Sequence, residues 1–524
     1  MLAAQLIDTL RLRYVHNDSK FKLAEAALTV YEGAIEAAYR LYQQTSDPQL
    51  FAKAFAMSEK SKAVLLLQSL KDVNARQFAQ IPDSLSQQER AIASQITRLE
   101  EQLFKARFNS AERDSLQIAE WENQLFALHR EREQLAQELE LIFPDYHRLK
   151  YDLQAHGIEE LQQALSEENR ALVEYFVGER NLAILYLDQD HFRWQIQPLP
   201  SNLPEQVQQF RGALASPLAT EEAEVLLENG LSLYYELIQP LYDLGVDTSK
   251  SWLMVPDGVL GYLPFEALMR SRPAQVGAYK TYDFLLFAQR LSYTYSAEIW
   301  LEMRQKKSTA SKTLIAFAPT FGPGDNPNRG FDPLRGGFSP LAHNQEEAEA
   351  VQATMGGRVL LGSEATELAF RQLAGQYQII HLSSHARVND TDPLYSQIAF
   401  SHTEKAEQDG LITVAELFEM HLPVEMIVLS ACETGVGKLY RGEGISSQAK
   451  GFAYAGAKSI ITTLWSINDA ASSILMPDLY EGLQAGMSKD EALREAKLRY
   501  IQQSDQLGAH PFYWAAFVPI GDMA

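Results

Sequence analysis

Two stretches, YQIIHLSSHA (377–386) and MIVLSACETG (426–435), decide the fold that the sequence predicts. Each begins with a short apolar run rich in Ile, Val and Leu and then passes into small polar residues. Such runs are typical of strands in a parallel sheet that is buried on both faces. Chemistry in such sheets lies at the carboxyl ends of the strands. We therefore expect His385 and Cys432, which follow the two strands, to leave the sheet at one edge.

The two side chains suit nucleophilic catalysis. A thiol needs a nearby imidazole to become a nucleophile near neutral pH, and the imidazole returns the proton to the leaving amine. Small residues flank both groups, so the backbone N–H groups of Ala386 and Cys432 are candidates for stabilising an oxyanion. The separation, 432 − 385 = 47 residues, is close to the spacing of about 50 between histidine and cysteine in caspases. The pattern favours a Cys–His catalytic pair.

Strands and helices alternate around these motifs from residue 312 to the end of the chain. A Gly/Pro-rich loop spans 320–340 and is expected to be a surface loop or a wall of the cleft. Such alternation predicts an α/β domain whose mostly parallel sheet is flanked by helices. The expected strands are TLIAFA (313–318), RVLL (358–361), the two quoted runs, SIITTLW (459–465) and WAAFVPI (514–520), and the expected helices are 344–355, 364–374, 413–420, 444–455, 468–485 and 488–504.

The region from about 170 to 296 has a different pattern. Alternating apolar residues predict three strands between 171 and 199, separated by turns at GERN (178–181) and DQD (188–190). Residues 204–245 are predicted to be helical. Two further strand-and-turn units are expected at SWLMVPDGVLGYLPFEALM (251–269) and LLFAQRLSYTYS (285–296).

The N-terminal part is predicted to be helical throughout residues 1–75. Apolar residues at three- and four-residue steps define one helix up to Asp47-Pro48 and a second from Phe51 to Leu70. The pair resembles a tetratricopeptide repeat. Only about one and a half units are present, where three or more usually form a stable array. The helices are therefore expected to pack on another part of the protein or to end a longer array.

Residues 86–142 contain no Gly or Pro and are rich in Gln, Glu, Arg and Leu. Their pattern predicts a long antiparallel helical hairpin that breaks near Asn109-Ser110. The expected fold is thus N-terminal α-helical repeat-like helices and a long hairpin, followed by the α/β part. The predicted domain bounds are 1–75, 76–149, 150–305 and 306–524.

Composition excludes several classes of function. The 524 residues carry a net charge of 46 − 68 = −22, which argues against binding nucleic acid or an anionic membrane. A single cysteine forms no internal disulfide and suits a reducing compartment. No run approaches the length of a membrane span, and MLAAQLIDTLRLRY (1–14) lacks the layout of a secretory signal. We expect a cytoplasmic protein without membrane attachment.

No metal or other cofactor is expected. Three of the histidines outside the strand-end motifs, His402, His421 and His510, have no metal-ligand spacing with carboxylates.

Several ordered motifs together resemble the CHAT family, caspase-like cysteine peptidase domains commonly attached to tetratricopeptide repeats. The resemblance covers roughly 150–524. The matching segments are DGVLGYLPFEAL (257–268), IIHLSSHA (379–386), DPLYSQIAF (392–400), VLSACETG (428–435), GFAYAGAKSIITTLWSIND (451–469) and HPFYWAAFVPIG (510–521). It implies that His385 is the general base and Cys432 the nucleophile. It also implies that 150–305 is an inactive caspase-like half or a companion sheet, as in separases.

The resemblance also points to a specificity residue. LWSIND (464–469) is similar to a run in separases, relatives that cleave after Arg, so Asp469 is a candidate for pairing with a basic P1 side chain. Asp469 is equally a candidate N-cap of the following helix, a role that it can share with Asn468. Glu433 and Glu443 are weaker acidic candidates. His381 matches a histidine that we interpret as embedded in its strand and structural.

The function predicted from the sequence is a cysteine endopeptidase that cleaves a protein substrate, with Arg or Lys as the candidate P1 residue. A protein regulator is expected on the N-terminal helices. Two alternatives stay open: a non-catalytic scaffold that carries a caspase-like domain, and a zymogen that needs a partner for activation. The retention of both His385 and Cys432 argues against the scaffold.

Overall fold

The computed structural model describes residue 7, 17–63, scattered residues between 66 and 106, 115–143, 156–217, 222–306, 308, 310–321, 338–389, 393–401, 409–431, 434–440 and 444–524. Within the described residues, eleven strands form one sheet in the order β3-β2-β1-β4-β5-β16-β15-β12-β8-β6-β7. The strands are β1 (Arg170–Val177), β2 (Asn181–Leu187), β3 (Phe192–Pro198), β4 (Ser251–Val255), β5 (Leu291–Tyr293), β6 (Lys312–Ala318), β7 (Arg358–Leu361), β8 (Tyr377–Ser383), β12 (Met426–Ser430), β15 (Ser459–Thr463) and β16 (Phe517–Gly521).

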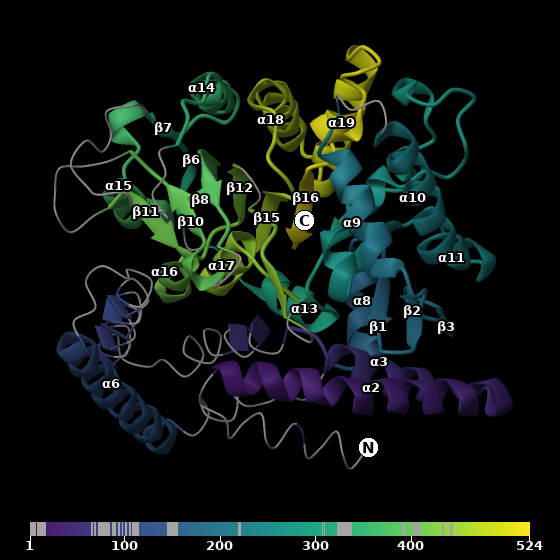
Figure 1. Cartoon of the computed structure of the whole chain (residues 1–524), viewed down its shortest axis with the longest axis horizontal. Helices are drawn as coiled ribbons and strands as arrows, with labels where there is room; N and C mark the ends of the chain where they lie inside the picture. Colours follow the sequence, from purple (N-terminus) through teal and green to yellow (C-terminus); the bar gives the residue numbers. More distant parts are fainter. Residues whose placement is uncertain are drawn as a thin grey trace.

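The sheet contains two parallel blocks that run in opposite directions, and β2 and β3 extend the first block as antiparallel strands. β1, β4, β5 and β16 are parallel to one another, and so are β15, β12, β8, β6 and β7. The blocks meet where β15 pairs antiparallel with β16. The C-terminal strand therefore lies between the two halves and joins them into one sheet (Figure 1). The division predicted at residue 305 stays a prediction.

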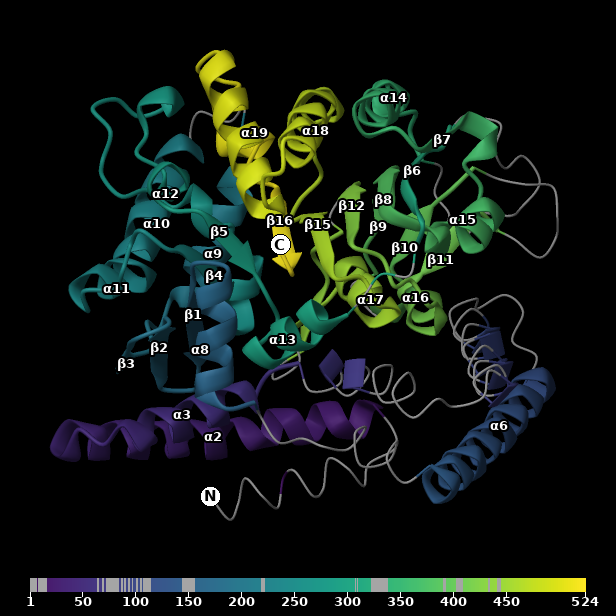
Figure 2. The same cartoon turned by 180° about the vertical axis from the view of Figure 1, so that it is seen from behind.

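Helices cover both faces of the sheet (Figures 1 and 2). One face packs against α9 (Leu203–Leu214), α10 (Glu222–Leu237), α14 (Asn344–Met355), α18 (Asp469–Gln484) and α19 (Lys489–Gln503). The other face packs against α2 (Asn17–Thr45), α3 (Pro48–Glu59), α8 (Ile158–Glu167) and α13 (Ala297–Gln305) in the first half and α15 (Glu367–Leu373), α16 (Val414–Glu419) and α17 (Gln448–Ala455) in the second. The predicted fold class, N-terminal helices before a mostly parallel, helix-flanked sheet, is confirmed.

The N-terminal helices pack directly on the sheet, as their small number led us to expect. α2 ends before Asp47, whose carboxylate caps α3 by accepting from the N–H of Gln49, and Pro48 occupies the first turn. The second helix predicted up to Leu70 is wrong in its length. α3 ends at Glu59, and Ala63 has a positive φ of 43° that no α-helix contains.

Part of the predicted hairpin is described. α6 (Ser115–Ile142) buries Leu135 and Leu139 against Ile92 and Ile96. These contacts agree with two helical arms that pack together. The predicted break near 109–110 lies outside the described residues.

Short strands replace some of the predicted loops and helix starts. β9 (Ala386–Arg387), β10 (Gln397–Ala399) and β11 (Leu411–Thr413) form a small antiparallel sheet, and β13 (Lys438–Tyr440) pairs with β14 (Gly444–Ser446). The helix predicted from 444 therefore begins only at Gln448. In the segment 285–296, predicted as strand and turn, LLFA forms the short helix α12 (Leu285–Ala288) before β5. A further short helix, α11 (Gln239–Asp243), completes the predicted helical region 204–245.

Candidate active site

The predicted meeting of two strand ends is confirmed. β8 and β12 are parallel neighbours, with Leu382 opposite Leu429 and Ser383 opposite Ser430. The N–H of Ser384 continues the ladder by donating to the carbonyl oxygen of Ser430 at 3.2 Å. Both chains therefore leave the sheet at the same level.

His385 lies two residues beyond β8 and is largely buried. Its Nε2 lies 2.7 Å from the carbonyl oxygen of Ser339. A carbonyl oxygen only accepts, so Nε2 carries the hydrogen and the neutral ring has its basic lone pair on Nδ1. Phe338 stacks on the imidazole at a centroid distance of 5.1 Å, and Phe321 contacts it edge-on at 4.8 Å. The ring is thus fixed in position and tautomer.

Burial lowers the pKa of His385 below its usual value, and the nearby Arg387 acts in the same direction. The carbonyl of Ser339 and the carboxylate of Asp469 oppose this shift without reversing it. A histidine with a lowered pKa is mostly neutral at pH 7, which is the state required of a general base.

Cys432 and Glu433 lie outside the described residues, but the chain on either side of them is described. The hydroxyl of Thr463, at the end of β15, donates to the carbonyl of Ala431 at 2.5 Å. It also accepts from the N–H of Thr434 at 3.3 Å, and the N–H of Gly435 donates to the carbonyl of Thr463 at 2.7 Å. We call these three bonds the Thr463 clamp. The clamp fixes both ends of the two-residue segment that contains the predicted nucleophile.

Ala386, the second predicted oxyanion donor, belongs to β9. Its partner across the small sheet is Ile398, and the N–H of Ala399 donates to the carbonyl of His385. That pattern makes Ala386 and Ile398 a non-hydrogen-bonded pair, in which the backbone groups point away from the partner strand. The N–H of Ala386 is therefore not used by β10.

Asp469 is the first residue of α18. The N-cap is Asn468, whose side chain accepts from the N–H of Ala471 at 3.0 Å, so of the two candidate residues Asn468 is the cap. Asp469 instead accepts from the backbone N–H of His343 at 2.6 Å. The negative charge of Asp469 also raises the pKa of His385, against the larger lowering by burial. The segment 339–343 thus contacts the candidate base at one end and Asp469 at the other.

The remaining candidates are separated from this site or not described. His381 is embedded in β8 as predicted, wholly buried, with Nε2 2.9 Å from a carboxylate oxygen of Glu347 and Nδ1 3.2 Å from the hydroxyl of Tyr480. His510 is buried and caps a short turn by accepting from the N–H of Phe512. His402 and Glu443 lie outside the described residues.

Sequence reasoning missed Ser339, His343 and Thr463. Ser339 acts through its carbonyl, which every residue type has, and His343 through its N–H. Thr463 is an ordinary β-branched strand residue in the sequence, and only the pairing of β12 with β15 brings it to Ala431.

Neither a cluster of metal ligands nor a membrane-spanning helix is found among the described residues. No three or more His, Cys, Asp or Glu side chains gather there in a way that would hold a metal ion. None of the helices in the same part of the chain is long and apolar enough to cross a bilayer.

Residues 227–522 match the family model of the CHAT domain. The chain is 24% identical over 307 residues to tetratricopeptide repeat protein 28 of Homo sapiens, an alignment that covers 53% of this chain and 12% of the relative. The Mus musculus protein of the same name gives the same identity and coverage. The chain therefore spans about an eighth of the length of the curated relatives that it matches.

Two solved structures are distantly similar. The Saccharomyces cerevisiae separase–securin complex gives a TM-score of 0.45 at 11% identity, covering 72% of this chain and 31% of that chain. The Arg-specific cysteine proteinase gingipain R gives a TM-score of 0.34 at 11% identity, covering 62% of this chain and 74% of that chain.

Proposed function

The chain belongs to the CHAT domain family, and we propose that it is a caspase-like cysteine endopeptidase in which Cys432 is the nucleophile and His385 the general base. One observation carries the proposal. His385 stands at the carboxyl end of β8, level with the end of β12, and the bond from Nε2–H to the carbonyl of Ser339 leaves Nδ1 as its basic nitrogen. A fixed imidazole beside the segment that contains a cysteine is what thiol activation requires.

The reaction follows from these roles. His385 Nδ1 takes the thiol proton, and the sulfur of Cys432 attacks the scissile carbonyl carbon. The N–H groups of Ala386 and Cys432 stabilise the oxyanion. When the carbon–nitrogen bond breaks, the imidazolium gives its proton to the leaving amine. A water molecule, deprotonated by His385, then hydrolyses the thioester, and the thiol regains its proton from the imidazolium.

Asp469 is our candidate for binding a P1 Arg or Lys. Its position at the start of α18 puts its charge close enough to His385 to affect that pKa. The bond from the N–H of His343 orients the carboxylate. A guanidinium group binds carboxylates in a fixed planar geometry, so an oriented carboxylate favours Arg over Lys.

The N-terminal helices are the proposed site of regulation. Beyond α3, the ammonium of Lys62 lies 2.6 Å from a carboxylate oxygen of Glu174 in β1. The carboxylate of Glu59 accepts from the N–H groups of Ala297 and Glu298 at the start of α13. Through these buried polar contacts, a protein that binds and moves the N-terminal helices would act directly on the sheet.

The test uses fluorogenic peptides that end in Arg, Lys, Asp or Leu and an irreversible thiol-directed peptide probe. Turnover after Arg or Lys is expected in the wild-type protein. It should be lost in Cys432→Ala and in His385→Gln, while His191→Gln, a substitution of an exposed histidine between β2 and β3, should leave it unchanged. Cleavage after another residue would keep the enzyme and remove Asp469 from its proposed role.

The two alternatives give different results in the same experiment. Labelling of Cys432 without turnover would support a zymogen that lacks its activator. Neither turnover nor labelling, under conditions where the denatured protein is labelled, would contradict the peptidase proposal and favour a scaffold.

A further inference from the structure

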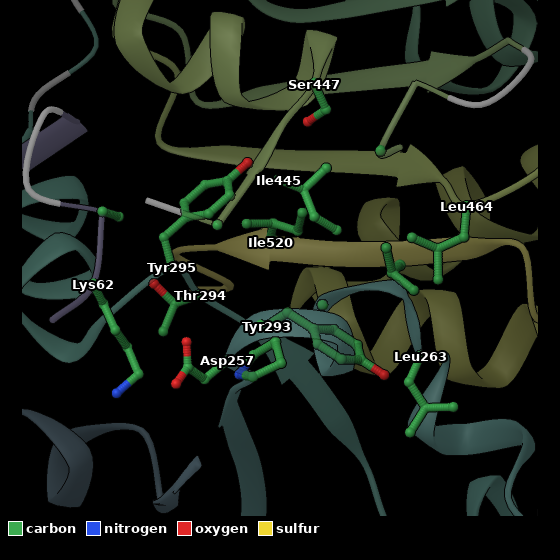
Figure 3. Close-up of a pocket in the computed structure, with 17 residues that line it drawn as sticks. Lys62, Asp257, Leu263, Tyr293, Thr294, Tyr295, Ile445, Ser447, Leu464 and Ile520 are labelled. Atoms are coloured by element: carbon green, nitrogen blue, oxygen red, sulfur yellow. The ribbon is translucent and has the colours of Figure 1, made fainter. Parts of the chain in front are cut away.

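A cavity of about 80 Å³ lies where the two halves of the sheet meet, and the proposed mechanism does not use it. Its lining residues come from the segment after α3, from the segments that follow β4 and β5, from β16, and from the chain that follows the predicted nucleophile (Figure 3). Four glycines line it, Gly258, Gly261, Gly435 and Gly444. A Cβ at Gly261 would lie 3.1 Å from a methyl carbon of Ile445, so these two segments approach closely there.

One side of the cavity has two charged lining residues, Lys62 and Asp257. Figure 3 shows Lys62, Asp257 and Thr294 together there. The ammonium of Lys62 is already bound by Glu174, at 2.6 Å, and by the hydroxyl of Ser58, also at 2.6 Å. Asp257 accepts from the N–H of Val177 at 2.7 Å. Lys62 thus lines the cavity, but its ammonium is already paired with Glu174.

Three carboxylates act on the ammonium of Lys62, and of these three only that of Asp257 lines the cavity. Glu59, Glu174 and Asp257 surround Lys62, and burial raises the pKa values of Glu59 and Asp257. For both carboxyls the charge of Lys62 only partly offsets this effect, while the charge of Glu174 adds to it. A buried site with this shortage of positive charge favours a cation.

Most of the remaining wall is apolar. Leu263, Leu464, Ile445, Val518 and Ile520 supply aliphatic surface, and Figure 3 shows Ile445, Leu464 and Ile520 on the side away from Lys62. Tyr295 also lines the cavity, and its buried hydroxyl has no hydrogen-bond partner among the described residues. A mostly apolar cavity with a few polar groups is typical of a site for a small organic ligand.

We propose that this cavity binds a small organic cation, an ammonium group with a short apolar body, and that its occupancy changes the reactivity of Cys432. The ammonium pairs with Asp257, and the apolar body lies against Ile445, Leu464 and Ile520. The binding claim is independent of the peptidase proposal.

The link to Cys432 runs through the Thr463 clamp. Gly435 lines the cavity and donates its N–H to the carbonyl of Thr463. A Cβ at Gly435 would lie only 3.0 Å from that carbonyl oxygen, so the contact is close. A ligand that moves the cavity wall at Gly435 therefore changes one of the three hydrogen bonds of the Thr463 clamp.

The first experiment measures binding of n-butylammonium by calorimetry, with n-butanol as the neutral probe. Saturable binding is expected for the amine. Asp257→Asn, which keeps the acceptor for Val177, should weaken it by about tenfold or more because the ion pair is lost. Ile520→Phe should weaken the binding of both probes by filling the space, whereas Asp243→Asn in α11 should leave amine binding unchanged.

The second experiment measures alkylation of Cys432, the single thiol of the chain, by iodoacetamide. Saturating n-butylammonium should change the rate by about threefold or more in the wild type and not in Asp257→Asn. Absence of saturable binding, or equal binding by Asp257→Asn, would overturn the proposed site. Binding without a change in alkylation rate would overturn the link to Cys432. Both readouts work whether or not the protein cleaves peptides.

Discussion

Two pairs of parallel strands end alike in this molecule but are used differently. Asp257 follows β4 by two residues, just as His385 follows β8, and Cys432 follows β12 in the sequence. At the first pair of strand ends, Asp257 is bonded to the N–H of Val177 and faces Lys62 from the N-terminal region. At the second pair, Nε2 of His385 donates a hydrogen bond to a carbonyl oxygen, and Nδ1 keeps its basic lone pair.

The difference shows what a strand end needs for chemistry. Opposite charges near β1 and β4 meet inside the protein, so this edge joins the N-terminal helices to the sheet. The edge at β8 and β12 holds an imidazole between aromatic rings, with its basic nitrogen not used by Ser339. The same topological position therefore serves docking in one half and, in our account, catalysis in the other.

The largest expected effect comes from removing the ammonium of Lys62, which lies near the ends of β1 and β4. Lys62→Met keeps the apolar stem but leaves Glu174 buried without its ammonium partner, a change that typically costs about 3–5 kcal/mol. Hydrogen exchange of the α3 amides should become much faster. Lys53→Met, at an exposed position of the same helix, should leave it nearly unchanged. Equal protection of α3 in both variants would contradict the docking role.

The second effect concerns the other edge. Thr463→Val keeps the shape of the side chain but removes the hydroxyl that holds Ala431 and Thr434. We expect peptide turnover to fall by about 10- to 100-fold, since small displacements of a reacting group are costly.

Thr462→Val is the matched control. The Thr462 hydroxyl contacts that of Thr434 but not the backbone on either side of Cys432. Its turnover should change by less than about threefold because the clamp is intact. If both variants lost turnover equally, the loss would reflect general damage to the strand rather than the clamp.

These two sites also show which parts of the structure can be predicted from sequence. The strand ends at His385 and Cys432 follow from local apolar runs, and Asp47-Pro48 marks a helix start by its own chemistry. The insertion of β16 between β5 and β15 depends on pairing between distant segments, which no local pattern encodes. The ion pair of Lys62 with Glu174 joins residues 112 positions apart. A contact through a backbone carbonyl, such as that of Ser339, cannot be predicted from the residue type, because every residue has this group.

The smallest expected effect concerns the pKa of His385 and the ring of Phe338 that stacks on it. Phe338→Leu removes the ring that stacks on the imidazole and admits water, so the pKa of His385 should rise toward its usual value. An NMR titration of the His385 ring measures this. Because the folded-state pKa is lowered, the associated stability is present above the unfolded-state pKa and declines as the pH falls through the folded-state value.

That decline should be weaker in Phe338→Leu than in the wild type. Phe287→Leu, at an exposed phenylalanine, should leave the titration of His385 where it is. A titration of His385 that does not move in Phe338→Leu would contradict the role of the stacked ring.

The most direct test of the central claim is the rate of Cys432 alkylation against pH in the wild type and in His385→Gln. If the two residues form a pair, the wild-type thiol should react at pH 7 about tenfold faster than in the variant, whose rate should follow one titration near the ordinary thiol pKa of about 8.5. Two superimposable profiles would show that His385 does not act on the thiol, and the account of this site would be wrong.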